Sequence, residues 1–318
     1  MNEISKESVS WITIDENGES QRIDNFLFKH LKGVPKSHIY RILRSGEVRV
    51  NSKRIDATCR LQTGDVLRIP PIRTAQPAAG GEAWSSPAPQ LSRHILYQDD
   101  ALLAIDKPAG IAVHGGSGVS RGVIEQLRLE HPEFKFLELV HRLDRETSGV
   151  LLLAKKRSAL TEMHRAMRDG ETEKRYFALV RGVWRNARQQ VRFPLHKYLT
   201  PAGERRVRVS EEGQSAHTIF TLQKIWAEFS LLEAELKTGR THQIRVHLAH
   251  LDFPIAGDDK YGDFPLNKAL QKLGLKRMFL HARRLAFKHP LTGEMLCLEA
   301  PLPDELESFL RSLESVIT

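Results

Sequence analysis

The first part of the chain carries apolar positions at helical spacing. Apolar residues recur every three or four positions over 23–31, which predicts a helix. Gly33 and a proline two positions later interrupt this pattern, and a second helix is predicted over 35–44. Gly46 marks its end, because a glycine after the last periodic residue is the usual helix stop. The chain therefore opens with a short helical pair.

A different periodicity follows these helices. The runs 48–50 and 53–55 are separated by Asn51 and Ser52, a turn-forming pair, which predicts a hairpin. Gly64 and Asp65 precede one more apolar run, and we expect a further strand at 66–69. Two helices followed by a hairpin and a strand form a complete small unit.

From residue 92 onward, short apolar runs alternate with helical patterns. Strands are predicted at 101–105, 136–140, 150–154, 176–180 and 229–236. Helices are predicted at 121–130, 158–169 and 245–251. This mixture favours an α+β domain built on a mixed, mainly antiparallel sheet.

The charge of the chain is unevenly distributed. Residues 22–73 contain 12 Lys or Arg against four Asp or Glu, so +8 of the net charge of +9 lies in this segment. A basic module of this kind indicates a polyanionic partner. Nucleic acid is favoured over a membrane surface, because the basic residues do not form one amphipathic helix. The chain also has no apolar run of about 20 residues that would span a bilayer.

Composition also sets the expected domain boundaries. Residues 74–90 are rich in Ala, Pro, Gly, Ser and Gln and lack apolar periodicity, which is typical of a linker. We therefore expect an N-terminal domain at 20–73 and a second domain at 91–318. Two cysteines, Cys59 and Cys297, are too few for a disulfide framework or a cysteine zinc cluster.

One polar loop in the second domain stands out chemically. Residues 141–149, hereafter the Asp144 loop, read HRLDRETSG between two apolar runs. Asp144 lies between Arg142 and Arg145, where a rigid scaffold would present a reactive carboxylate. The alternative, that Asp144 is a turn former within a solvated ion-pair cluster, is left open by the local sequence.

Four other segments have the composition of site-building sequence. They are glycine-dense, or place an aromatic or cationic residue at the end of a predicted strand or turn. These segments are 106–118, 173–176, 239–248 and 256–263.

Two parts of the chain resemble known families. The helix-helix-hairpin pattern, with Arg22-Ile23-Asp24 and the segment SGEVRVN at 45–51, resembles the small RNA-binding domain of ribosomal protein S-four. That resemblance implies phosphate contacts rather than base reading by the basic residues of the helices and hairpin. They are Lys36, Arg41, Arg44, Arg49, Lys53 and Arg54.

The region from residue 92 to the C terminus, with the Asp144 loop, resembles the Rlu family of pseudouridine synthases. The resemblance implies that Asp144 is the catalytic carboxylate, Tyr176 an aromatic that stacks on the target base, and Arg245 the buried partner of Asp144. It also assigns substrate binding to His141 and Arg142, with Arg142 filling the gap left by a flipped-out nucleotide. The implied activity is isomerisation of uridines in large-subunit ribosomal RNA.

The expected enzyme needs no cofactor and no metal, because the isomerisation involves no net redox change. His242, His247 and His250 are an alternative zinc site, disfavoured because no carboxylate or cysteine accompanies them at ligand spacing. We expect a cytoplasmic monomer that does not bind membranes.

Two rival functions remain: an RNA-binding ribosome-assembly factor without activity, and a nucleoside hydrolase. An intact set of Asp144, Tyr176 and Arg245 disfavours the first, and the lack of a second placed acid disfavours the second. The sequence leaves open which uridines are modified. It also leaves open whether Asp144 attacks C1′, removes the 2′ proton or adds to C6.

Overall fold

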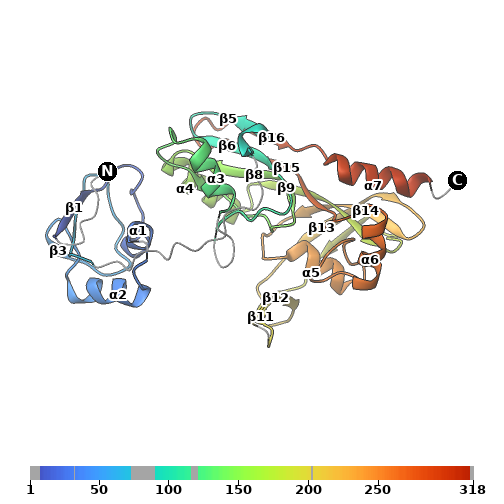
Figure 1. Ribbon diagram of the computed structural model, residues 1–318, viewed down its shortest axis with the longest axis horizontal. Coiled ribbons are helices and arrows are strands. Elements are labelled where there is room, and N and C mark those ends of the chain that lie inside the picture. Colours follow the sequence, from blue (N-terminus) through green and yellow to red (C-terminus); the bar gives the residue numbers. More distant parts are fainter. Residues whose placement is uncertain (1–7, 32, 73–89, 116–120, 202, 316–318) are drawn as a thin grey trace. The chain divides into compact units, whose positions relative to one another are not determined.

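The computed structural model divides into two compact units, residues 1–82 and 83–318 (Figure 1). The structure describes residues 8–31, 33–72, 90–115, 121–201 and 203–315. The predicted linker at 74–90 lies outside these ranges apart from Gln90, as do Gly116, Ser117 and Gly118 of the glycine-dense segment.

The first unit packs two helices on a four-stranded antiparallel sheet. Its elements are β1 (Ser10–Thr13), α1 (Ile23–His30), α2 (Lys36–Ser45), β2 (Arg49–Val50), β3 (Lys53–Arg54) and β4 (Val66–Ile69). The strand order is β1-β4-β2-β3. Helix α2 ends where Gly46 takes a left-handed φ of 76° and its N–H donates to the carbonyls of Ile42 and Leu43. The predicted helices, hairpin and last strand are present, whereas β1 was not predicted.

The second unit is built on a ten-stranded mixed sheet. The long path of the sheet is β10-β13-β14-β9-β15-β8-β6-β5, with β16 beside β15 and β7 beside β8. Its strands are β5 (Ile95–Gln98), β6 (Leu102–Lys107), β7 (Glu138–Leu139), β8 (Ser148–Ala154), β9 (Glu173–Arg181), β10 (Arg188–Val191), β13 (Thr218–Ile225), β14 (Phe229–Leu236), β15 (Leu280–Lys288) and β16 (Met295–Glu299). Every pairing is antiparallel except β15 with β8. The predicted α+β class with a mainly antiparallel sheet is confirmed.

Helices and one separate hairpin complete this unit. They are the 3-10 turn η1 (Leu91–His94), α3 (Val123–Glu130), α4 (Arg157–Arg168), the hairpin β11 (Leu195–Leu199) with β12 (Arg205–Val209), α5 (Gln243–His250), α6 (Phe264–Lys272) and α7 (Asp304–Ser315). In Figure 1 the β11–β12 hairpin projects from the body of the unit.

Strand β8 lies at the centre of the core and carries the end of the Asp144 loop. All seven of its residues are buried. Leu151 and Leu153 pack in one cluster with residues of α3 and α5, and Leu152 packs in another with residues of α4. Burial on both faces explains why its sequence is continuously apolar rather than alternating. The loop is therefore attached to a strand that is buried on both faces.

Candidate active site

The Asp144 loop is held to the sheet by a close backbone approach at its end. Ser148 and Gly149 pair in parallel with His281 and Ala282 of β15. A Cβ added to Gly149, whose φ is 108°, would lie 2.2 Å from the Ala282 carbonyl oxygen. Only glycine fits there, so the sequence at this position fixes where the loop leaves the sheet.

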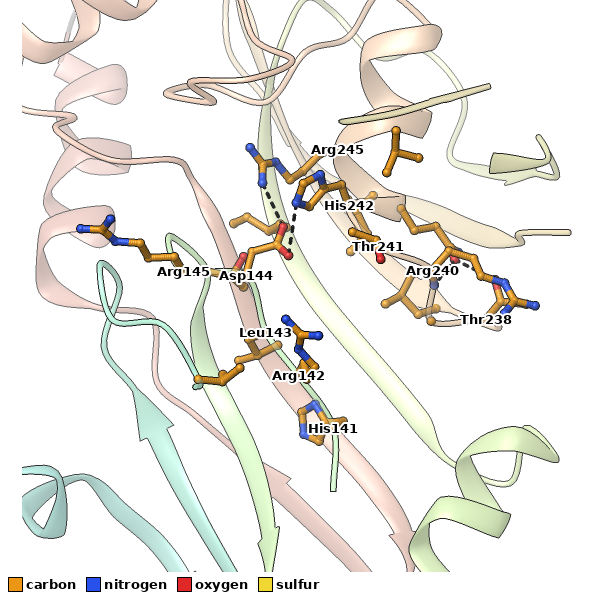
Figure 2. Close-up of a pocket in the computed structure, with 18 of the residues that line it drawn as sticks. His141, Arg142, Leu143, Asp144, Arg145, Thr238, Arg240, Thr241, His242 and Arg245 are labelled. Carbon is orange, nitrogen blue, oxygen red and sulfur yellow. Dashed lines mark hydrogen bonds and ion pairs between the residues drawn. The ribbon is translucent and has the colours of Figure 1, made fainter. Parts of the chain in front are cut away.

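Asp144 meets two cationic or potentially cationic side chains from the segment around the start of α5. Arg245 Nη1 donates to Asp144 Oδ2 at 2.9 Å, and His242 Nε2 lies 3.8 Å from Asp144 Oδ1 (Figure 2). The Asp144 side chain is 28% exposed. The carboxylate is thus oriented from behind and still reachable from the cleft in front.

Arg245 is itself held by a second carboxylate. Its Nε and Nη2 donate to the two oxygens of Asp258, each at 2.8 Å. The Arg245 side chain is 4% exposed and that of Asp258 is 0% exposed. Burial acts to raise the pKa of Asp258, but the hydrogen bonds and charge of Arg245, together with the backbone N–H groups of Lys260 and Tyr261, outweigh it and hold the pKa below its ordinary value. This buried, bidentate pair fixes the guanidinium that orients Asp144.

His242 and Tyr261 form a third support. His242 has a left-handed backbone (φ 53°), and its Nδ1 lies 2.8 Å from the Tyr261 hydroxyl. That hydroxyl accepts the backbone N–H of Val207 in β12 at 3.0 Å, so its own proton is directed at Nδ1. Burial lowers the pKa of His242, which favours the neutral ring. The remaining N–H of His242 then faces Asp144.

Tyr176 and Arg142 line the same cleft. Tyr176 comes from β9, and burial, with the nearby charge of Asp144, raises the pKa of its hydroxyl. Its ring is also part of the main apolar cluster, so one residue serves as both core and cleft wall. Arg142 is exposed and, among the described residues, pairs with no carboxylate. Asp144, Tyr176, Arg142 and Arg245, which the family resemblance singled out, thus line one cleft, and their roles stay predictions.

The cleft of about 1720 Å³ around Asp144 is strongly basic. Its lining contains eleven Lys or Arg against three Asp or Glu. The cations are Arg142, Arg145, Arg168, Lys174, Lys197, Arg205, Arg206, Lys237, Arg240, Arg245 and Lys260. A cleft of this size and sign suits a polyanion rather than a small neutral metabolite.

Comparison with known proteins agrees with this chemistry. Residues 101–250 match the RNA pseudouridylate synthase family, and residues 21–67 match the S4 domain. Ribosomal large subunit pseudouridine synthase C of Pasteurella multocida is 50% identical over 311 residues, covering 98% of this chain and 95% of the relative. The Escherichia coli K12 protein of that name is 52% identical over 310 residues, covering 96% of each chain. The chain belongs to the RNA pseudouridylate synthase family.

Solved structures of RNA pseudouridylate synthase domain proteins share the fold of this synthase. Human RNA pseudouridylate synthase domain containing 4 matches with a TM-score of 0.58 and 31% identity over 70% of this chain and 94% of the other. Human RNA pseudouridylate synthase domain containing 1 matches with a TM-score of 0.55 at 23% identity over the same shares, which supports the fold alone. The predicted family and the S-four-like domain are confirmed.

The synthase uses two further residues to fix the Asp144 loop from within. His141 Nε2 accepts the backbone N–H of Leu152 at 3.1 Å, and burial lowers the His141 pKa to about 4. The buried Lys107 donates from Nζ to the carbonyls of Pro108, Ile111 and Arg145 at 2.7, 2.8 and 3.1 Å. Residues 107–111, part of the segment 106–118 that composition singled out, therefore brace the loop. Substrate binding by His141 stays a prediction.

The loop residues point in different directions. Figure 2 shows the Arg142 side chain extending toward Asp144 and the Arg145 side chain extending away from Asp144. Arg145 Nε donates to the carbonyl of Gly110 at 2.9 Å, and Gly110 N–H donates back to the Arg145 carbonyl. Both arginines line the cleft, but only Arg145 is tied to the neighbouring segment through Gly110.

Sequence reasoning missed Asp258, His242 and Tyr261 as parts of the site. Asp258 and Tyr261 lie in the segment 256–263 that composition singled out, but no spacing rule links them to Asp144. His247 of the alternative zinc site is engaged elsewhere, with Thr218 Oγ1 at 3.0 Å and the Phe193 carbonyl at 3.0 Å. Within the described ranges, no three His, Cys, Asp or Glu gather to hold a metal ion, and no helix is long and apolar enough to cross a membrane.

A buried histidine below the loop predicts acid sensitivity. His281 Nε2 is 3.2 Å from the Ala300 carbonyl and its Nδ1 is 2.9 Å from Ser148 Oγ, so the neutral ring satisfies both contacts. Burial lowers its pKa from 6.5 to about 4. Between those values the unfolded chain binds more protons than the folded one, so this stabilisation is complete above pH 6.5 and is lost as the pH falls toward 4.

We therefore expect His281→Gln to flatten the fall in the free energy of unfolding between pH 6.5 and pH 4. Urea unfolding at several pH values measures this. The exposed His250→Gln provides the matched control and should keep the dependence of the parent protein. Parallel curves for both variants would contradict the assignment to His281.

Proposed function

We propose that this protein isomerises specific uridines of large-subunit ribosomal RNA to pseudouridine, with Asp144 as the catalytic carboxylate acting on a flipped-out uridine. The observation that carries the proposal is the Asp144–Arg245 contact of 2.9 Å at the base of a basic cleft. Pure RNA binding has no use for a carboxylate that repels phosphate. The names of the relatives supply the substrate, large-subunit ribosomal RNA.

The reaction needs one reactive carboxylate and a way to hold a detached base. The N1–C1′ bond breaks, the uracil turns in place, and C5 bonds to C1′. The C5 proton leaves and N1 gains one, so atoms balance without a redox partner. Positive charge that develops at C1′ is stabilised or captured by Asp144, as carboxylates do in glycosidases. No second acid is required, because water takes no part.

Tyr176 is proposed to stack on the uracil while it is detached. Its ring stands in the wall of the cleft near Asp144, and base–aromatic stacking contributes about 1–3 kcal/mol. Extruding a base from a stack costs a few kcal/mol. The unpaired Arg142 would offset this cost by occupying the position that the extruded nucleotide leaves.

His242 is proposed as a positioning residue. The Tyr261 hydroxyl fixes its tautomer, and the ring closes one side of Asp144. The pair also links β12 to the carboxylate, since Val207 N–H holds Tyr261. RNA that contacts the β11–β12 hairpin would thereby contact the strand that supports this pair.

The first unit is proposed as an RNA anchor within a cytoplasmic, monomeric enzyme that needs no cofactor or metal. The six basic residues predicted to contact phosphate are all exposed. Two of them contact other side chains: Arg41 Nη1 lies 3.4 Å from Glu47, and Lys36 Nζ lies over the Phe28 ring. We expect the remaining four to contribute most to RNA binding.

The experiment that tests the function is pseudouridine mapping in large-subunit ribosomal RNA from cells with and without this chain. Specific positions should lose the modification on deletion and regain it on expression of the parent protein. Restoration should fail with Asp144→Asn. If deletion leaves the modification map unchanged, the proposed activity is contradicted and an RNA-binding role remains.

Removal of residues 1–90 tests the anchor. We expect the remaining chain to convert uridine at high enzyme concentration, because Asp144, Tyr176 and Arg245 are retained. RNA affinity should fall, and the salt slope should become shallower by about 0.7 to 0.9 for each lost phosphate contact. Binding at two salt concentrations and product mapping measure both effects. An unchanged slope and site pattern would place specificity in the second unit alone.

A further inference from the structure

The outer face of the N-terminal sheet carries one aromatic and three cationic residues at directly opposed positions on its four strands. Trp11 of β1 lies opposite Arg68 of β4, Arg68 lies opposite Arg49 of β2, and Arg49 lies opposite Arg54 of β3. Directly opposite residues in antiparallel strands share a face. The four residues, hereafter the Trp-Arg row, therefore cross all four strands over about 14 Å.

This face is solvent-exposed, whereas the other face is core. Val50, Leu67 and Ile69, which neighbour the row along their strands, are buried against α1 and α2. Trp11 is 49% exposed, unusually open for a tryptophan. Arg49 and Arg54 are exposed and Arg68 is half-buried. The row is thus a surface feature rather than an extension of the core.

The three arginines are anchored by backbone contacts at the end of α2. Arg49 Nε donates to the Gly46 carbonyl at 3.2 Å, and Arg68 Nη1 donates to the Glu47 carbonyl at 2.6 Å. Arg54 Nη2 donates to the carbonyl of Arg44. A guanidinium has five N–H donors, so each of these contacts leaves most of the donors free. The side chains are positioned in advance without being saturated.

No carboxylate neutralises the row among the residues that the structure describes. Glu47 and Asp56 each lie two positions from a row arginine and are engaged elsewhere. Glu47 contacts Ser45 Oγ at 2.6 Å and Arg41 Nη1 at 3.4 Å, and Asp56 Oδ1 accepts the backbone N–H of Thr58 at 2.6 Å. Three preorganised guanidinium groups that pair with no carboxylate are complementary to phosphates, which they can bind with two parallel hydrogen bonds each.

We infer that the Trp-Arg row binds a single-stranded segment of RNA, with phosphates on Arg49, Arg54 and Arg68 and an unpaired base stacked on Trp11. The inference rests on the proposed function in that the partner is RNA. A duplex has no free base face to offer the indole, whereas an unpaired nucleotide does. Arg68 and Trp11 thereby join the binding surface, and the paired Arg41 of α2 is not part of it.

Tryptophan fluorescence of the full-length protein reports on the row directly. Trp184 and Trp226 are buried, so a Trp84→Phe background makes Trp11 the exposed reporter. Titration with an oligouridylate should quench it, and a blunt RNA duplex of equal length should not. Trp11→Ala should weaken oligouridylate binding about five- to tenfold, and Trp11→Phe should retain most of the affinity. Equal quenching by duplex, or none by either RNA, would overturn the stacking.

Salt dependence separates phosphate binding from a structural role. Arg49→Gln, Arg54→Gln and Arg68→Gln should each make the slope of log K against log salt shallower by about 0.7. Arg60→Gln is the matched control, since Arg60 is also exposed and donates to one backbone carbonyl, that of Ser20 at 2.8 Å. Its slope should stay at the parent value. If the salt slopes and the melting temperatures of the three row variants equal those of the parent protein, the arginines do not bind phosphate. Their contacts with the carbonyls at the end of α2 would then be their role.

Pseudouridine formation is measured on the same preparations. If the parent protein converts uridine and the row variants bind RNA as the parent does, RNA binding by the Trp-Arg row is contradicted. The proposed function is then unaffected. If the parent protein does not convert uridine but binds oligouridylate through the row, the proposed function is contradicted. RNA binding by the Trp-Arg row is then unaffected. A lipid vesicle or an acidic peptide that competes for Trp11 more strongly than RNA would overturn the choice of partner.

Discussion

Replacing Asp144 with Asn is expected to lower pseudouridine formation by at least about 10³-fold, below the detection of an end-point assay. Asn is close to Asp in shape, so the contact with Arg245 Nη1 survives in altered form, but the carboxylate that acts at C1′, the 2′ proton or C6 is gone. RNA affinity should stay within a few-fold of the parent. Single-turnover conversion and equilibrium binding measure the two quantities separately.

The neighbouring Asp259 supplies the control for this experiment. Its carboxylate also contacts Arg245, at 3.4 Å, but it is 69% exposed. Asp259→Asn removes the same charge from the same cleft and should convert uridine at nearly the parent rate. Robust turnover by Asp144→Asn would remove Asp144 from its role. Equal losses in both variants would indicate a general charge effect.

Replacing Asp258 with Ala is expected to give the largest loss of stability, about 3–5 kcal/mol in the free energy of unfolding. The substitution leaves the Arg245 guanidinium buried without its bidentate partner. It also removes the acceptor for the backbone N–H groups of Lys260 and Tyr261. Urea unfolding measures the effect, and turnover should fall as well, because Arg245 is then free to leave its position beside Asp144.

Asp259→Ala again provides the comparison. An exposed ion pair contributes about 0–1 kcal/mol, so this variant should unfold within that range of the parent protein. Similar unfolding free energies for the two alanine variants would contradict the view that the Arg245–Asp258 pair supports the site.

The parts of the site that sequence could supply are those that are contiguous in the chain. The Asp144 loop is bounded by apolar runs, and β8 carries a continuous apolar run, so the positions of the loop and of this strand follow from local patterns. Tyr176, Arg245 and Arg142 were assigned through a family resemblance, and the structure places them in one cleft. Their roles remain proposals with direct tests.

What sequence could not supply depends on register and on distant partners. Asp258 reaches Arg245 because a turn after α5 folds back, and no periodicity encodes that contact. Strands such as β10, with the sequence RQQV, lack apolar alternation and were not predicted. The Trp-Arg row exists only after β1, β4, β2 and β3 have paired, since its members are separated by up to 57 positions in the chain.

The close approach of Gly149 to the Ala282 carbonyl bears on protein engineering. Any side chain at that position would place its Cβ 2.2 Å from the carbonyl oxygen. The direction in which the loop leaves the sheet is set by pairing with β15, which lies more than a hundred positions downstream. A graft of residues 141–149 into a foreign scaffold would lack that template. A scaffold designed to hold this loop would therefore need the parallel pair β8 and β15, together with α5 and Asp258.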